Sequence, residues 1–195
     1  MVKRLTMVFA LVLIWATLSQ AADWMVDPDH SFVTFEVRHL VISKARGQFG
    51  DFTATVSFDE ANLEKGSVEM VVQTKSIDTD NADRDKHLSS PEFLDVENHP
   101  TMTFKSKKIA RGEGNSFEIR GDLTIRGVTK EVTFECEFHG IAKDPWGNTK
   151  AGFSATTTIN RQDFNVSWSK KLDTGGLVVG DDVKINLELE FKQAS

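Results

Sequence analysis

The chain of 195 residues has a single cysteine, Cys136, and no tyrosine. One thiol cannot form an internal disulfide, so the small disulfide-stapled secreted domains are excluded, and stability must come from buried apolar side chains. Only four prolines are present, and we find no linker, internal repeat or low-complexity segment. An apolar run of the roughly 20 residues that span a bilayer is also lacking, because the run from Leu5 to Leu18 is shorter. A single domain is therefore predicted.

The first 21 residues have the pattern of a secretory signal peptide. Lys3 and Arg4 precede the apolar run, and Ser19-Gln20-Ala21 places small residues at the positions that signal peptidase reads. We expect cleavage after Ala21, which leaves one domain over residues 22–195, and no stable membrane insertion afterwards. A retained N-terminal anchor is the alternative.

The charge of the chain disfavours anionic partners. Cleavage would remove two of the 23 basic residues and none of the 29 acidic ones, which leaves a net charge of −8. Nucleic acids and anionic membrane surfaces are bound by clusters of Lys and Arg. Neither is expected as a partner of this chain.

Alternation of apolar and polar residues runs almost from end to end. In the last example Val183, Ile185, Leu187, Leu189 and Phe191 share one face, which is the pattern of a strand with one buried side. Most connections are too short for a helical crossover, so neighbouring strands are antiparallel. We predict an all-β fold, an eight-stranded antiparallel lipocalin-like barrel, because closure removes unpaired edges and eight strands can enclose one small ligand. The predicted strands fall at 31–38, 52–58, 68–74, 102–104, 117–125, 132–138, 153–159 and 183–191.

The segment from Ile77 to Pro100 interrupts this pattern with acids, bases and two histidines. Asn81 or Asp80 can cap a short helix, so a helical insertion is predicted near residues 79–95. Leu88, Phe93 and Leu94 are its large apolar residues, and we expect them to seat the insertion on the barrel.

Motifs for catalysis and metal binding are missing. Residues 78–83 resemble the start of a calcium-binding EF-hand loop, but its sixth position is Asp83 instead of Gly and its twelfth is Ser89 instead of Glu. None of the five histidines has zinc-ligand spacing, and no nucleophile elbow is present. Cys136 shares the parity of buried residues. We therefore predict neither an enzyme nor a metal or cofactor site.

The interior is rich in phenylalanine, of which the chain has fourteen. A filled core explains an aromatic stripe, and the pattern alone favours that interpretation. The alternative is an apolar tunnel, because the small residues Ala54, Gly121, Cys136 and Ala155 lie among the rings and would leave space. His39 falls on the inward parity at the end of its strand. It either bonds a backbone carbonyl near the rim or contacts a polar ligand head there.

These residues together resemble a known family. Trp24-x-x-Asp27-Pro28-x-His30-Ser31, with Phe35, His39, Gly47 and Phe49, is similar to the start of the YceI-like proteins. So are the segments 76–88, 121–130 and 161–164, with Trp168 and Val179-Gly180-Asp181. The matches follow the family's order across essentially the whole mature chain.

The resemblance implies a lipocalin-like barrel exported to the bacterial periplasm, where it carries a long isoprenoid or similar amphiphile of the quinone or polyprenyl phosphate type in its tunnel, without catalysis. An enzyme acting on a lipid head group, with His39 or His87 and Asp85, is the competing hypothesis. A structural or stress-response barrel with a filled core is another, and a homodimer is left open. The predicted ligand-binding residues are Phe35, His39, Arg46, Phe52, Arg84, Asp85, Phe93, Phe104, Phe134, Phe153 and Trp168.

Overall fold

A computed structural model of the chain describes residues 22–59, 62–171 and 176–194. The predicted signal peptide, residues 1–21, lies outside the described residues. The strands are β1 (Ala22–Val26), β2 (Phe32–His39), β3 (Ser43–Phe49), β4 (Phe52–Phe58), β5 (Ser67–Gln73), β6 (Ile77–Asp78), β7 (Thr101–Arg111), β8 (Ser116–Ile125), β9 (Val128–Lys143), β10 (Thr149–Asn160) and β11 (Val179–Gln193). The helices are α1 (Ala82–Ser89) and the short 3-10 helices η1 (Pro28–His30), η2 (Leu63–Lys65), η3 (Thr74–Ser76) and η4 (Arg161–Phe164).

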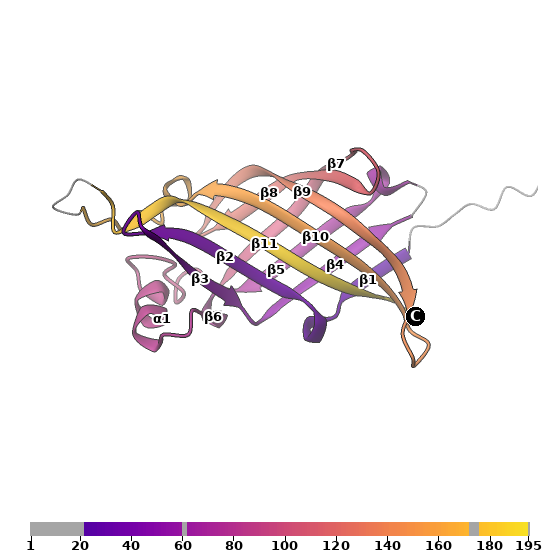
Figure 1. Cartoon of the computed structure of the whole chain (residues 1–195), viewed down its shortest axis with the longest axis horizontal. Coiled ribbons are helices and arrows are strands. Elements are labelled where there is room, and N and C mark those ends of the chain that lie inside the picture. Colours follow the sequence, from indigo (N-terminus) through magenta and orange to yellow (C-terminus); the bar gives the residue numbers. More distant parts are fainter. Residues whose placement is uncertain (1–21, 60–61, 172–175, 195) are drawn as a thin grey trace, which may run out of the picture.

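The strands form an antiparallel sheet that closes on itself (Figure 1). The closed ring has the order β1-β4-β5-β7-β8-β9-β10-β11, and the end of β11 pairs back with β1 through Trp24 opposite Gln193. The first part of β11 pairs instead with β2, and β2 pairs with β3. The predicted eight-stranded antiparallel barrel is confirmed.

Two of the eight positions in the barrel wall are each occupied by two consecutive strands, β1 with β2 and β3 with β4. β1 and β2 lie on the same edge of β11, and η1 interrupts them, capped by the Asp27 side chain, which accepts a hydrogen bond from the Asp29 N–H at 3.2 Å. β3 and β4 are separated only by Gly50 and Asp51. The β2–β3 hairpin therefore continues the wall toward the end of the barrel where α1 lies (Figure 1).

Alternation along each strand separates the core from the surface. In β4, Phe52, Ala54, Val56 and Phe58 are buried while the intervening Thr53 is exposed. Successive side chains of a strand point to opposite faces, so the sequence pattern is sufficient to direct these four residues inward. The barrel interior is accordingly almost entirely aliphatic and aromatic.

Gly121 marks an irregularity between β7 and β8. The register shifts between Ser106 and Lys108, so β7 carries one extra residue opposite β8. A Cβ atom on Gly121 would lie 2.4 Å from the Lys105 backbone oxygen and 2.6 Å from the Phe104 ring. Glycine is therefore required for the close approach of the two strands.

The helical insertion lies at one end of the barrel (Figure 1). Asn81 caps α1 by accepting a hydrogen bond from the Arg84 N–H at 3.0 Å, as predicted. The α-helix ends at Ser89, and the chain continues through hydrogen-bonded turns. No helix in the described residues combines the length and apolar character needed to cross a membrane.

Candidate functional site

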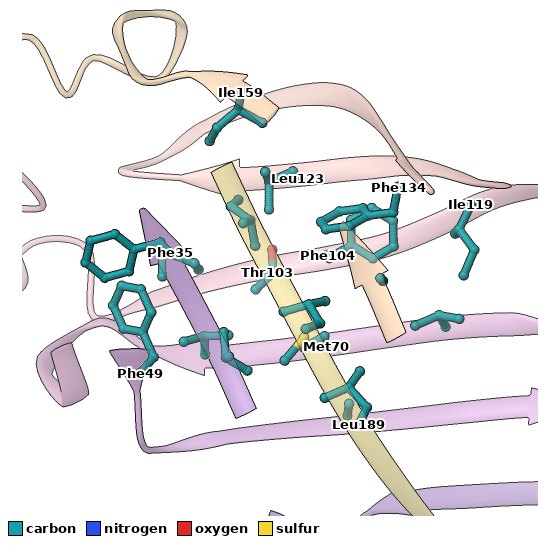
Figure 2. A pocket seen from close by; sticks show the side chains of 18 of the residues that line it. Phe35, Phe49, Met70, Thr103, Phe104, Ile119, Leu123, Phe134, Ile159 and Leu189 are labelled. Carbon is teal, nitrogen blue, oxygen red and sulfur yellow. The ribbon is translucent and has the colours of Figure 1, made fainter. Parts of the chain in front are cut away.

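The barrel encloses a cavity of about 250 Å³. Figure 2 shows side chains from opposite walls of the barrel pointing into it, among them Phe35, Met70, Leu123 and Leu189. Apolar groups dominate the lining, which is interrupted by a few hydroxyl groups, such as that of Thr103, and by one charged side chain. A space of this kind holds an apolar ligand by burial rather than by hydrogen bonds.

Aromatic rings divide the interior into regions. Phe104 and Phe134 meet edge to face in mid-cavity with ring centroids 5.2 Å apart, and Phe35 lies 5.7 Å from Phe49 (Figure 2). The end of the barrel opposite α1 is filled by a cluster of rings around Phe153. The other members of this cluster are Phe58, Phe117, Phe138 and Phe191, with Trp24 stacked on Phe58.

Small residues leave the space that the rings do not fill. Ala54, Cys136 and Ala155 line the cavity, as the tunnel hypothesis requires, whereas Gly121 is buried against Phe104 and does not line it. Burial raises the pKa of the Cys136 thiol to about 12, so this thiol stays neutral. Cys136 is part of an apolar wall and not a nucleophile.

The insertion covers one end of the cavity. Leu88, Phe93 and Leu94 line it from that side, which confirms that they seat the insertion on the barrel. Phe93 is only 6% exposed, and its ring lies 4.9 Å from that of His87 and 5.2 Å from that of Trp168. α1 itself has no fully buried residue. The insertion, residues 79–95, is called the cap below, and it is held on the barrel mainly by Phe93 and its neighbours.

Among the residues that the structure describes, Arg161 is the one charged side chain in the cavity lining, and the sequence prediction missed it. It is 5% exposed, and burial lowers its pKa while the neighbouring Asp181 carboxylate opposes that shift. A guanidinium has five N–H groups, and all five have an acceptor here. The acceptors, at 2.6 to 3.5 Å, are the backbone oxygens of Val166, Trp168, Val179 and Gly180 and one carboxylate oxygen of Asp181.

Because every donor is used, Arg161 has none to offer a ligand. Its role is to bind the connection between η4 and β11 to the end of the barrel. The Arg-x-Asp-Phe segment was visible as a family motif, but no sequence pattern indicates which carbonyl groups an arginine will bind.

A polar groove of about 350 Å³ lies beside the cavity. Thr34 and Phe35 line both spaces, so the apolar interior and this groove adjoin at these two residues. Gly47 makes this arrangement possible, because a Cβ atom there would lie 2.6 Å from both the Phe35 ring and the Thr79 methyl group. Carboxylates outnumber cations among the residues that line the groove. The residues that line the groove are Phe35, Gly47, Thr34, Glu36, Arg46, Gln48, Asp78, Thr79, Asp80 and Asn186.

Most of the predicted apolar binding residues border the cavity. Phe35, Phe93, Phe104, Phe134 and Phe153 line it. Phe52 is buried in the core but is not part of the lining, because inward parity does not ensure an adjacent space. Trp168 also lies behind the wall, packed against Phe93 and His87.

The predicted polar residues do not converge on one mouth. His39 ends β2, opposite Ser43 and Val179, and does not line the cavity. Arg46 is exposed in the polar groove and pairs with Glu36 at 3.5 Å.

Arg84 and Asp85 instead hold the start of α1 to β6 through Thr79. Asp85 accepts hydrogen bonds from the Thr79 N–H at 3.0 Å and from its hydroxyl group. Arg84 donates to the Thr79 hydroxyl oxygen at 2.7 Å and to its backbone oxygen. Only Arg46 of these polar residues lies in a groove beside the cavity.

A cluster of possible metal ligands lies outside the barrel interior. Ligand atoms of Asp27, His30 and Glu190 lie within 4.8 Å of one another. The Lys150 ammonium group already pairs with both carboxylates, at 2.8 Å for Glu190. Its hydrogen bond to Asp27 lowers the pKa of that carboxyl group. The lysine supplies the positive charge that a metal would, so the cluster is an ion-pair network that joins η1 to β10 and β11.

Comparison with known proteins identifies the family that the motifs indicated. Residues 24–191 match the YceI-like domain. Protein YceI of Escherichia coli is 40% identical over 186 residues, which cover 94% of this chain and 95% of that protein. The crystal structure of Burkholderia cenocepacia BcnA has a TM-score of 0.74 at 28% identity, covering 85% of this chain and 98% of that one.

A similar fold also occurs in a more distant protein. A polyisoprenoid binding domain from Saccharophagus degradans, implicated in plant cell wall breakdown, has a TM-score of 0.67. Its sequence is 13% identical, and the comparison covers 90% of this chain and all of that domain, so the likeness is one of fold. The match to residues 24–191 and the identity to Protein YceI establish that the chain belongs to the YceI-like family.

Proposed function

We propose that this protein is an exported carrier that holds the apolar chain of an isoprenoid or similar amphiphilic lipid inside its barrel. The observation that carries the proposal is the apolar cavity inside the barrel, which is bounded by the aromatic cluster around Phe153 on one side and by the cap on the other. Burial of apolar area contributes about 25 cal/mol per Å², so a long chain binds firmly without strong polar anchors. The polyisoprenoid binding domain of Saccharophagus degradans supports the ligand class, since it shares the fold.

The polar groove beside Phe35 is the proposed position of the lipid head group. Glu36, Asp78 and Asp80 face one cation, Arg46, in this groove. A phosphate would meet net negative charge there and lose free energy to repulsion. An uncharged head group of the quinone type therefore fits better than a polyprenyl phosphate.

Binding is favoured over catalysis by the contacts of the residues that an enzyme would use. The His87 ring pairs with Glu92, and one Asp85 oxygen already accepts two hydrogen bonds from Thr79. An acid–base pair formed by these two residues would first have to break those bonds. His39→Gln and Asp85→Asn variants that still hold lipid but lose turnover would favour the enzyme instead.

A filled-cavity variant tests lipid binding directly. Ala155 lines the cavity, whereas Thr158 on the same strand is exposed. Ala155→Leu should lower the affinity of delipidated protein for a quinone with a long isoprenoid tail, and the matched Thr158→Leu should not. Titration with the same quinone without its tail, and with a polyprenyl phosphate, separates the contributions of chain and head group. Equal affinities in wild type and both variants would exclude the cavity as the binding site.

Export to the periplasm is the remaining part of the proposal, and the signal-peptide pattern of residues 1–21 supports it. Cell fractionation followed by intact-mass measurement should give a periplasmic chain that begins at Ala22. A chain that retains residues 1–21 in the membrane fraction would indicate the anchor instead.

A further inference from the structure

The turn between β2 and β3 presents two large apolar side chains to solvent. Val41 is 60% exposed and Ile42 is 84% exposed. Isolated apolar residues on a surface are ordinary, but these two are adjacent and lie at the end of a hairpin. The neighbouring Leu40 is fixed in place, because its N–H donates to the Val178 backbone oxygen at 2.9 Å.

The backbone of this turn is unfavourable for the residues that form it. Leu40 has a φ of 51° and Val41 a φ of 66°, in the left-handed region that Gly and Asn adopt most readily. A β-branched residue such as valine is strongly disfavoured there. Glycine at these positions would make the fold more stable, because it adopts a positive φ without strain. The apolar side chains at this tip therefore indicate a contact outside the molecule.

Basic residues lie next to the tip in the strand register and hydrogen bonds of the backbone. Arg38 and Lys44 face each other across the hairpin, and the N–H of Val178 donates to the Lys170 backbone oxygen at 2.9 Å, which brings Lys170 and Lys171 beside Leu40. Within the described residues, Arg38, Lys170 and Lys171 form no ion pair, while Lys44 pairs with Glu36.

Within the described residues, acidic side chains cancel only part of this charge, and Glu36 is paired with Lys44. Of the two aspartates near the start of β11, Asp181 is bound by Arg161, which leaves Asp182. Counted over the residues that the structure describes, the tip is thus locally positive on a chain whose formal net charge is −6.

We propose that the β2–β3 tip docks on an anionic lipid bilayer. Val41 and Ile42 enter the boundary between head groups and acyl chains, and the surrounding Lys and Arg side chains contact the anionic head groups. The negative charge of the whole chain argues against binding through other surfaces, so docking is transient and confined to this end. An exposed apolar turn with unpaired basic residues next to it matches the layered chemistry of a membrane surface better than that of a protein partner.

The position of the tip links docking to lipid transfer. The tip lies at the same end of the barrel as α1 and the start of β11 (Figure 1). Phe35 lies on β2, and it is five residues before Leu40, or about 17 Å along an extended strand. Docking would therefore hold the polar groove near the membrane surface. This use of the contact rests on the proposed lipid-binding function, whereas the docking itself does not.

Flotation of the full mature chain with vesicles tests the proposal. Vesicles of phosphatidylglycerol and phosphatidylethanolamine should bind the protein at low salt, and phosphatidylcholine vesicles should bind it much less. Val41→Gly/Ile42→Ser removes both apolar side chains and should lower the affinity at least about tenfold. Glycine relieves the positive φ at position 41, so this variant should be no less stable than the wild type, which thermal unfolding checks. Lys170→Gln/Lys171→Gln should lower the affinity for anionic vesicles about fivefold per charge.

Trp146→Ser is the matched control, because Trp146 is 83% exposed on a hairpin at the opposite end of the barrel. It should leave vesicle binding unchanged. Unaltered binding by Val41→Gly/Ile42→Ser, or loss of binding by Trp146→Ser, would overturn the proposal. So would a wild-type chain that does not bind anionic vesicles; a dimer that the double variant abolishes would then identify a second copy as the partner of the tip. The vesicles contain no isoprenoid, so their result is independent of whether the cavity binds one.

Discussion

Replacing Phe93 by alanine should loosen the cap without unfolding the barrel. Phe93 is buried between His87, Trp168 and the cavity, while α1 has no fully buried residue of its own. A buried Phe→Ala change costs about 3–5 kcal/mol. We take the lower figure, about 3 kcal/mol, because one side of the ring already faces a cavity. The fraction of molecules with an open cap should then rise about a hundredfold.

Asp83→Ala is the matched control in the same insertion. Asp83 is exposed in the first turn of α1, where a carboxylate favours the helix by about 0.3–1 kcal/mol. This variant should therefore change the open fraction less than about fivefold. Both proteins keep the closed ring of strands, so their global unfolding transitions should remain cooperative.

Hydrogen exchange measured by mass spectrometry reads out the difference. Peptides that cover residues 79–95 should exchange much faster in Phe93→Ala, while those from β8 and β9 should change little. The rate of release of a bound isoprenoid to acceptor vesicles should rise in parallel. If Phe93→Ala and Asp83→Ala gave the same exchange and the same release as the wild type, the insertion would not be a lid.

Three further predictions concern the buried Arg161, the ion pair between Lys150 and Asp27, and the Cys136 thiol. Arg161→Met should lower the free energy of unfolding in urea by about 3 kcal/mol, because it leaves buried carbonyl groups and the half-exposed Asp181 carboxylate without a hydrogen-bond donor. An unchanged urea midpoint would refute the role of Arg161 in holding the connection between η4 and β11. Lys150 lowers the pKa of Asp27 in the folded protein, so this pair stabilises the fold above the ordinary carboxyl pKa of 3.8 and loses that contribution as pH falls below it. Asp27→Asn should therefore flatten the acid limb of the stability curve, and an identical limb would contradict this. Cys136, with its pKa raised to about 12, should resist iodoacetamide at pH 8 until the protein is denatured, and rapid native labelling would show an exposed thiol.

Strands with a regular apolar alternation were predictable, and those without it were not. β4 and β11 follow the sequence pattern closely. β3, with the sequence Ser-Lys-Ala-Arg-Gly-Gln-Phe, has no apolar alternation, and its conformation depends on pairing with β2. Periodicity detects a strand through burial of its own side chains, so an edge segment held by backbone hydrogen bonds gives no signal.

The apolar lining was more predictable than the polar contacts for the same reason. Parity directs Phe104 and Phe134 inward wherever the strand lies in the sheet. The partners of Arg84 and Arg161 depend on which loops fold back beside them, and a single sequence does not encode that placement. Parity also cannot distinguish Phe52, which fills space, from Phe153, which borders it.

Native mass spectrometry of the protein purified from cells without added lipid tests the central claim most directly. The account predicts a mature chain that carries one lipid with an isoprenoid tail, and a loss of that added mass in Ala155→Leu but not in Thr158→Leu. A wild-type protein that arrives without lipid, and that takes up none when offered a long-tailed quinone, would contradict the account and indicate a barrel that serves no lipid.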